Sequence, residues 1–260
     1  MKQHTFAICA YQDSPYLEAC IRSLKGQTVG SRIILCTSTP SRYLEKTAKR
    51  YRIPLYVREG QSDIQEDWNF AYHMAGNGLV TIAHQDDLYH KDYALTAIRA
   101  MEKYQDATLF TTDCAIIKNG RLKRPDGVAL VKKLLRMPLR IPAFNHLTAV
   151  KMSALVFGNP IICPACTYNK DLLGEPLFDS PYKFALDWDT SVKLAKRPGR
   201  FLCIERPLMY YRIHEGATTK ACIVDHRRVR EEALMFSRFW PAPFVKLITH
   251  FYMRSYHAYD

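Results

Sequence analysis

Short apolar runs alternate with segments that have one apolar helical face through the first hundred residues, and few folds accommodate such a pattern. The runs span residues 5–10, 33–36, 55–57 and 79–83. Between the first two, Leu17, Ile21 and Leu24 lie at helical spacing after Ser14 and Pro15, a pair typical of a helix start. Repeated strands and helices predict a parallel sheet with helices on both faces, and such sheets bind ligands beyond the carboxyl ends of their strands.

The same spacing predicts three more helices in residues 1–110, which we interpret as one half of the fold. Their inward residues are expected to be Leu44, Ala48 and Tyr51 in one, Ile64, Trp68, Ala71 and Ala75 in the next, and Leu95, Ile98 and Met101 in the last. Asp63 and Asp92 are expected to cap the second and third of these helices.

After Leu109 the alternation stops, which predicts a second half of mixed structure over residues 111–222 and a basic, aromatic, mostly helical tail over 223–260. The expected elements are a strand over 109–117, a hairpin turn at Asn119-Gly120, a helix over 187–195, and two separate strands over 201–204 and 208–213.

The formal charge of +12 predicts an anionic partner: nucleic acid, an acidic membrane surface or phosphorylated small molecules. The sequence contains no apolar run of about 18 residues that could span a bilayer, and its polar start is typical of a strand rather than of a signal peptide. We therefore expect a cytoplasmic protein whose cysteines are reduced.

Two adjacent carboxylates follow the run at 79–83, in the order His84-Gln85-Asp86-Asp87. Neighbouring carboxylates repel each other, so a bound cation is a natural reason to hold both at the sheet edge. Oxygen ligands suit Mg²⁺ or Mn²⁺, which bridge to phosphate. Two solvated loop acids beside a helix start remain the alternative.

Two later motifs also carry groups suited to catalysis. Asp187 and Asp189 flank Trp188 where a helix is expected to open, so either acid could be a general base, or both could serve only the helix dipole. Arg212 and His214 end the last predicted strand, where arginine could meet phosphate and histidine a metal ion. A surface histidine with neither role is the alternative.

Together and in this order, these motifs resemble the family 2 glycosyltransferases of the GT-A fold, from about residue 4 to about residue 220. FAICAYQDSPYLEACIRSLKGQT is similar to that family's first strand, nucleotide-contacting tyrosine and following helix, and HQDD to its acidic metal motif. The stretch from Gly158 to Thr219 is similar to its acceptor segment, its acid pair and its terminal RxH with a following threonine.

The resemblance implies an α/β GT-A fold, a Rossmann-like, mostly parallel sheet flanked by helices. It implies transfer of a sugar, with inversion and a divalent cation, from a nucleotide donor to a hydroxyl of a glycan or lipid-linked acceptor. Asp187 is implied as the base, with Asp189 as second choice, and Asp87 and His214 as metal ligands. The implied contacts to the nucleotide sugar are Ala10, Tyr11, Asp13, Thr37, Trp68, Asn69, Asp86 and Arg212.

Three positions depart from the family pattern. Gln12 stands where asparagine is frequent, and His84 stands in place of the first acid of the metal motif. The segment Cys36-Thr37-Ser38-Thr39 has no acid to face the nucleobase. A UDP-sugar is therefore favoured only modestly over the alternatives.

Basic residues crowd the segment from Lys118 to Arg140, where Val128, Val131, Leu134 and Leu135 could form an apolar helix face. This pattern predicts attachment to the inner face of an anionic membrane, assisted by the aromatic tail; a basic helix over the active site, or a subunit contact, is the alternative. A nucleic-acid-binding module is disfavoured because the aromatics follow core spacing. A sugar-phosphate nucleotidyltransferase is disfavoured because no glycine follows the first strand.

Overall fold

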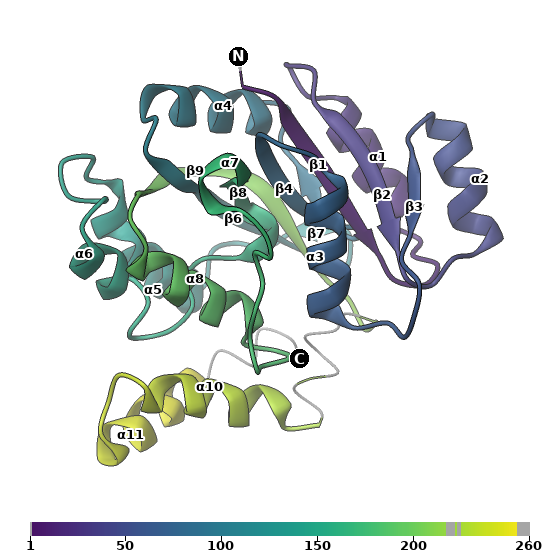
Figure 1. Ribbon diagram of the computed structural model, residues 1–260. Helices are drawn as coiled ribbons and strands as arrows, with labels where there is room; N and C mark the ends of the chain where they lie inside the picture. The colour runs from purple at the N-terminus through teal and green to yellow at the C-terminus, as the bar shows by residue number, and fades with distance from the viewer. Residues whose placement is uncertain (1, 217–221, 223–224, 254–260) are drawn as a thin grey trace.

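The computed structural model describes residues 2–216, 222 and 225–253, and in them one nine-stranded sheet carries helices on both faces (Figure 1). The strand order is β3-β2-β1-β4-β8-β6-β9-β5, with β7 paired to β6. The strands are β1 (His4–Ala10), β2 (Arg32–Thr37), β3 (Leu55–Val57), β4 (Leu79–His84), β5 (Leu88–Tyr89), β6 (Ala107–Lys118), β7 (Arg121–Leu122), β8 (Cys166–Asn169) and β9 (Arg200–Ile213).

β1 pairs in parallel with β2 and with β4, and β2 pairs in parallel with β3, as expected. β8 lies antiparallel between β4 and β6, and β9 pairs in parallel with β6. The sheet is therefore mixed, and the predicted α/β class is confirmed. The sheet consists of a parallel first part, from β1 to β4, and a second part in which parallel and antiparallel pairs are mixed.

The two faces of the sheet are covered by different helices, because successive strand residues point to opposite sides. In β1, Phe6 and Ile8 pack on one side and Ala7 on the other. The first side is covered by α1 (Leu17–Lys25), α2 (Arg42–Tyr51) and α4 (Tyr93–Lys103). The second is covered chiefly by α3 (Ile64–Met74) and α8 (Leu186–Lys196).

The remaining helices are short or lie at the edge of the molecule. They are α5 (Gly127–Arg136), η1 (Met137–Arg140), α6 (Thr148–Ser153), η2 (Cys163–Ala165), α7 (Lys170–Leu173), α10 (Arg227–Ser237) and α11 (Ala242–Met253). The helical tail is thus confirmed for the described residues, and α10 and α11 lie together at the bottom of the view in Figure 1.

Several local predictions are confirmed by the backbone. Asp63 accepts hydrogen bonds from the N–H groups of Gln65 and Glu66 at the start of α3. Asn119 and Gly120 have φ values of 52° and 73° in the turn between β6 and β7, the left-handed conformation that a two-residue hairpin requires.

Other local predictions were wrong. The two strands expected over 201–204 and 208–213 are one strand, β9, whose register against β6 shifts at Thr112 and Asp113. There the Thr112 hydroxyl donates to the Arg206 carbonyl and accepts from the Leu208 N–H, so the sheet continues past Pro207. Helix α1 begins at Leu17, because Ser14 caps a turn that precedes the helix by accepting from the Tyr16 N–H. Leu95 is only half-buried.

No helix in the described ranges is both long enough and apolar enough to cross a membrane. All eight cysteines are free thiols.

Candidate active site

A cavity of about 2680 Å³ lies where β1, β4 and β9 end, and α3, α5 and α8 also contribute to its walls. It therefore lies at the sheet edge that strand alternation predicted. Of the twelve residues expected at the site, the structure brings eight to this cavity: Ala10, Tyr11, Asp13, Trp68, Asp86, Asp187, Arg212 and His214. Thr37, Asn69, Asp87 and Asp189 do not line it.

The two adjacent acids after β4 have different surroundings. Asp86 faces the cavity, and its Oδ2 lies 2.8 Å from the Nε2 of His214. Burial alone would raise the pKa of Asp86, but the His214 hydrogen bond and the neighbouring imidazoles hold that pKa below its usual range. Asp86 is therefore an anion beside a histidine, a pair of groups that suits a divalent cation.

Asp87 is buried, with 1% of its surface exposed, and its Oδ1 accepts the backbone N–H of Arg212 at 2.9 Å. Burial and then the charge of Asp86 raise the pKa of Asp87 well above its usual range, so its carboxyl group is suited to carrying a proton. Asp87, expected as a metal ligand, thus joins β9 to the end of β4 and does not line the cavity.

Arg212 and His214 are fixed against the loop that follows β1. The Arg212 Nε donates to the Asp86 carbonyl at 2.8 Å, and its guanidinium lies 4.4 Å from the centre of the Tyr16 ring. The same ring lies 4.9 Å from the imidazole of His214. Tyr16 thus holds both side chains at the cavity wall. The two threonines that follow His214, Thr218 and Thr219, lie outside the described residues.

The two acids of α8 point to different sides of the helix. Asp187 lines the cavity, and burial raises its pKa to about 6 against the opposing effects of Lys132 and of a hydrogen bond from Asn159. Asp189 is 1% exposed and forms ion pairs with Arg238 and Lys193. Asp189, the second choice of base, thus lies outside the cavity lining and connects α8 to the C-terminal segment.

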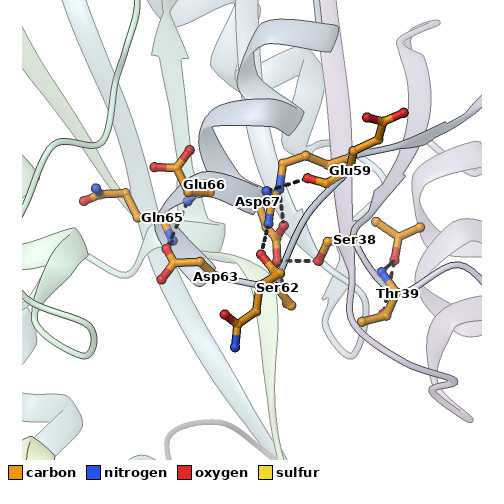
Figure 2. A network of polar contacts seen from close by, with 11 residues as sticks. Ser38, Thr39, Glu59, Ser62, Asp63, Gln65, Glu66 and Asp67 are labelled. Atoms are coloured by element: carbon orange, nitrogen blue, oxygen red, sulfur yellow. Dashed lines mark hydrogen bonds and ion pairs between the residues drawn. The ribbon is translucent and has the colours of Figure 1, made fainter.

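A polar network surrounds the start of α3, which contributes Asp67 to the cavity wall (Figure 2). The Asp67 carboxylate accepts hydrogen bonds from Ser38 after β2, Ser62 and Arg58, at 2.9, 2.9 and 2.7 Å. Figure 2 shows Asp67 between Ser38 and Ser62, so α3 supplies the acid that the end of β2 lacks. Trp68 beside it packs against His84, with ring centres 5.1 Å apart.

Two polar residues expected to bind the donor serve the fold instead. The Thr37 hydroxyl accepts the Thr39 N–H at 3.0 Å and is buried under the turn after β2. The Asn69 amide donates to the Phe178 carbonyl and accepts the Phe178 N–H, at 2.6 and 2.9 Å. Each side chain is occupied by backbone groups that need partners in a buried position.

Tyr16, Asp67 and Asn159, which contact the candidate residues or line the cavity beside them, were not singled out in the sequence, and Lys132 was expected only as part of the basic segment. Asp67 directly precedes Trp68 and Asn69, so the cluster Asp67-Trp68-Asn69 was the available signal. Lys132 and Asn159 approach Asp187 from α5 and from the loop before η2, contacts between segments far apart in sequence. No spacing rule predicts such contacts.

Asp86 and His214 are the cavity residues suited to holding a divalent cation. In the described part of the chain, no group of three or more His, Cys, Asp or Glu side chains could hold a metal ion. Asp86 and His214 together supply one carboxylate oxygen and one imidazole nitrogen. Such a pair fits Mn²⁺ or Mg²⁺ if phosphate oxygens and water complete the shell, as is usual for nucleotide-bound cations.

Helix α5 directs a lysine toward the cavity and buries an arginine, while leucines of the same helix are exposed. Lys132 lines the cavity, where burial lowers its pKa, and Arg136 is buried in an ion pair with Asp113. Leu130 and Leu134 are instead 67% and 61% exposed. Lys132 therefore faces the active site, while Leu130 and Leu134 keep most of their surface exposed.

The family model for glycosyl transferase family 2 matches residues 5–165. Among solved structures, the chain is similar to TarS of S. aureus in complex with UDP-GlcNAc, with 14% identity, a TM-score of 0.65, and coverage of 99% of this chain and 73% of that one. It is similar to the mannosyltransferase PcManGT of Pyrobaculum calidifontis, in complex with GDP-Man and Mn²⁺, with 15% identity, a TM-score of 0.63 and coverage of 96% and 68%.

A third similar structure is glucosyl-3-phosphoglycerate synthase from Mycobacterium tuberculosis in complex with Mn²⁺ and UDP-glucose, with 15% identity, a TM-score of 0.60 and coverage of 91% and 79%. At these identities the likeness shows a shared fold, the expected GT-A fold. Among curated proteins, no sequence matches this chain.

Proposed function

The chain belongs to glycosyl transferase family 2, and we propose that it transfers a hexose from a UDP-sugar to a hydroxyl group of a glycan or lipid-linked acceptor, with inversion. The coarser activity, a glycosyltransferase that uses a nucleotide sugar, follows from the family. The observation that carries the finer proposal is a single cavity with Asp86 and His214 on one wall and Asp187 on another. Residues 1–110 bind the donor in this proposal, and residues 111–222 bind the acceptor.

Each cavity wall has a chemical task in the proposed reaction. Asp187 accepts the proton of the acceptor hydroxyl, whose oxygen attacks the anomeric carbon of the donor. As that bond forms, the bond from the anomeric carbon to the diphosphate breaks on the opposite side, which inverts the configuration. Arg212, held by Tyr16, offers positive charge to the diphosphate.

A divalent cation would be held by Asp86 and His214 and, when bound, would neutralise the charge that builds on the leaving diphosphate. Two of the similar structures contain Mn²⁺ with a nucleotide sugar, which supports this choice. Asp86 replaces Asp87 in the proposal, because only Asp86 lines the cavity.

The Asp67 network is proposed to receive the nucleobase. Ser38, Ser62 and Arg58 use three of the roughly four acceptor positions of a carboxylate, which leaves one acceptor. A single acceptor matches the one ring N–H of uracil, whereas guanine presents a ring N–H and an amino group side by side and would leave one of these donors without a partner. UDP should therefore stabilise the protein against heat more than GDP does in Mn²⁺, and Asp67→Asn should weaken UDP binding about tenfold, or about 1.4 kcal/mol.

Thermal denaturation with a panel of nucleotides measures the preference, and calorimetry measures the affinity. Glu66→Gln, an exposed change one residue away on α3, is the matched control. Equal stabilisation by UDP and GDP, or unchanged UDP affinity in Asp67→Asn, would contradict the assignment of the base site.

A peripheral membrane location is also part of the proposal. Residues 114–169 carry nine Lys and Arg and one acid, Asp126, and exposed Leu130, Val131 and Leu134 project from α5 among them. α11 carries exposed Phe244, Leu247 and Phe251, and both helices line the cavity. Apolar residues within a basic field suit an anionic bilayer, at about 1 kcal/mol for each basic group near the surface.

Sedimentation with vesicles tests this location. The protein should bind phosphatidylglycerol vesicles at low salt, lose binding as salt rises, and bind pure phosphatidylcholine weakly. Leu130→Ser with Leu134→Ser should reduce binding about tenfold, at roughly 1 to 2 kcal/mol for burying such side chains. Lys132 and Arg136 are unsuited to this test because Lys132 faces the cavity and Arg136 is buried in an ion pair.

Leu172→Ser, at an exposed leucine on α7, is the matched control for those two changes. No binding to phosphatidylglycerol vesicles at low salt would contradict the membrane location. A dimer in sedimentation that the same pair of changes dissociates would assign the exposed leucines to a second copy of the chain.

A further inference from the structure

A residue of α10 binds the backbone that leads into α8, the helix that carries Asp187. The Glu231 carboxylate accepts the N–H groups of Lys183, Phe184 and Ala185, which directly precede α8, at 3.1, 2.7 and 2.9 Å. Hydrogen bonds from backbone N–H groups to an ionised carboxylate are shorter and stronger than those to neutral acceptors. Glu231 thus fixes the three residues that lead into α8.

A second contact comes from α11 and reaches Asp187 through Asn159. The Tyr252 hydroxyl accepts the Asn159 N–H at 3.3 Å, and the Asn159 side chain hydrogen-bonds to the Asp187 carboxylate. Gly158 lies against the Tyr252 ring so closely that a Cβ there would be 2.6 Å from Tyr252 Cε2. This fit leaves the loop that carries Asn159 little freedom to move away from Asp187.

The residues that flank Asp187 on α8 bind the same two helices. The Trp188 ring packs against Phe236 and stacks on Tyr252, with centres 5.0 and 6.5 Å apart. Asp189 forms an ion pair with Arg238 at the end of α10. The first turn of α8 is therefore held by α10 and α11 on its buried side, while Asp187 faces the cavity.

We propose that Glu231 and Tyr252 are positioning residues that hold Asp187 in the orientation for proton transfer, so that the C-terminal helices complete the active site. The inference rests on the proposed function of Asp187 as the base. Displacement of a reacting group by about 1 Å can cost about a hundredfold in rate, so contacts outside the cavity can govern turnover. Donor binding uses other walls of the cavity and should not depend on them.

The test compares Glu231→Gln with Arg230→Gln, an exposed change at the neighbouring position of α10, in the full chain. Hydrogen exchange of the amides of residues 183–185 is measured together with release of nucleoside diphosphate from UDP-GlcNAc, UDP-glucose or GDP-mannose in Mn²⁺. Glu231→Gln should speed exchange at these amides, lower kcat about tenfold and leave the donor KM within about twofold. Arg230→Gln should change none of the three.

Tyr252→Phe provides a second variant that keeps the aromatic packing and removes only the hydroxyl. It should also lower kcat with little change in donor KM. Unchanged exchange at residues 183–185 in Glu231→Gln, or wild-type kcat in both variants despite faster exchange, would overturn the inference. If the wild-type chain released diphosphate from no donor, the proposed function would fail, and the exchange measurement would still decide whether Glu231 holds α8.

Discussion

Asp187→Asn is expected to lower turnover about a hundredfold or more and to leave donor affinity nearly unchanged, the usual result of removing a positioned proton acceptor. The side chain lines the cavity, and burial raises its pKa to about 6. A carboxylate with that pKa is still ionised at neutral pH and accepts a proton more readily than an ordinary aspartate. Asparagine keeps the shape of the group and cannot take the proton.

The raised pKa also fixes the direction of the pH dependence. A base works when deprotonated, so wild-type turnover should be full well above pH 6 and should fall as the pH drops through about 6. Steady-state kinetics across this range checks both statements.

Asp189→Asn is the matched control, two residues away on the same helix. It removes one partner of an ion pair with Arg238, so it should lower the thermal midpoint of unfolding. The folded enzyme should lose less turnover than Asp187→Asn does. A larger loss of turnover in Asp189→Asn than in Asp187→Asn would show that the wrong acid has been assigned.

Asp86→Ala is expected to raise the Kd for UDP in Mn²⁺ to the value measured in chelator. Loss of a group that merely supports a metal ligand costs about 10- to 100-fold in metal affinity, so loss of a direct ligand should cost at least that much. Calorimetric titration of UDP with Mn²⁺ and with chelator measures the difference.

Asp87→Asn separates the two adjacent acids. Its amide oxygen can still accept the Arg212 N–H, so the join between β4 and β9 is kept while one carboxylate is removed. The dependence of UDP binding on Mn²⁺ should survive in this variant. If Asp87→Asn abolished it and Asp86→Ala did not, Asp87 would be the ligand despite its burial.

The parts of this protein that were predictable from sequence are those set by neighbouring residues. Alternating apolar patterns located β1 to β4 and α2 to α4, the Asp63 cap followed from one residue, and Asn119-Gly120 located the turn between β6 and β7. Strand ends also placed Asp86 and His214 at one edge of the sheet, because the topology forces those ends together.

Side-chain direction was not predictable, because it depends on packing between distant segments. Asp86 and Asp87 are adjacent and equally acidic, yet the Arg212 backbone, 125 residues beyond Asp87, draws the second of them inward. In α8 the contact that turns Asp189 away from the cavity is Arg238, in a helix of the tail. Helix α5 is a surface helix, as its composition indicates, but its one buried side chain is the charged Arg136, which Asp113 holds inside the protein.

The insertion of β8 between β4 and β6 has a consequence for how the chain reaches this fold during synthesis. Until residues 166–169 have emerged from the ribosome, β4 has β1 on one side and an open edge of unpaired N–H and C=O groups on the other. The other edge of β6 stays unpaired until β9, residues 200–213, has been made. Contacts across such sequence separations form slowly, so the open edge of β4 is exposed to pairing with other chains while residues 85–169 are made. A fragment that ends near residue 110 would keep that open edge permanently, and aggregation rather than nucleotide binding is its expected fate.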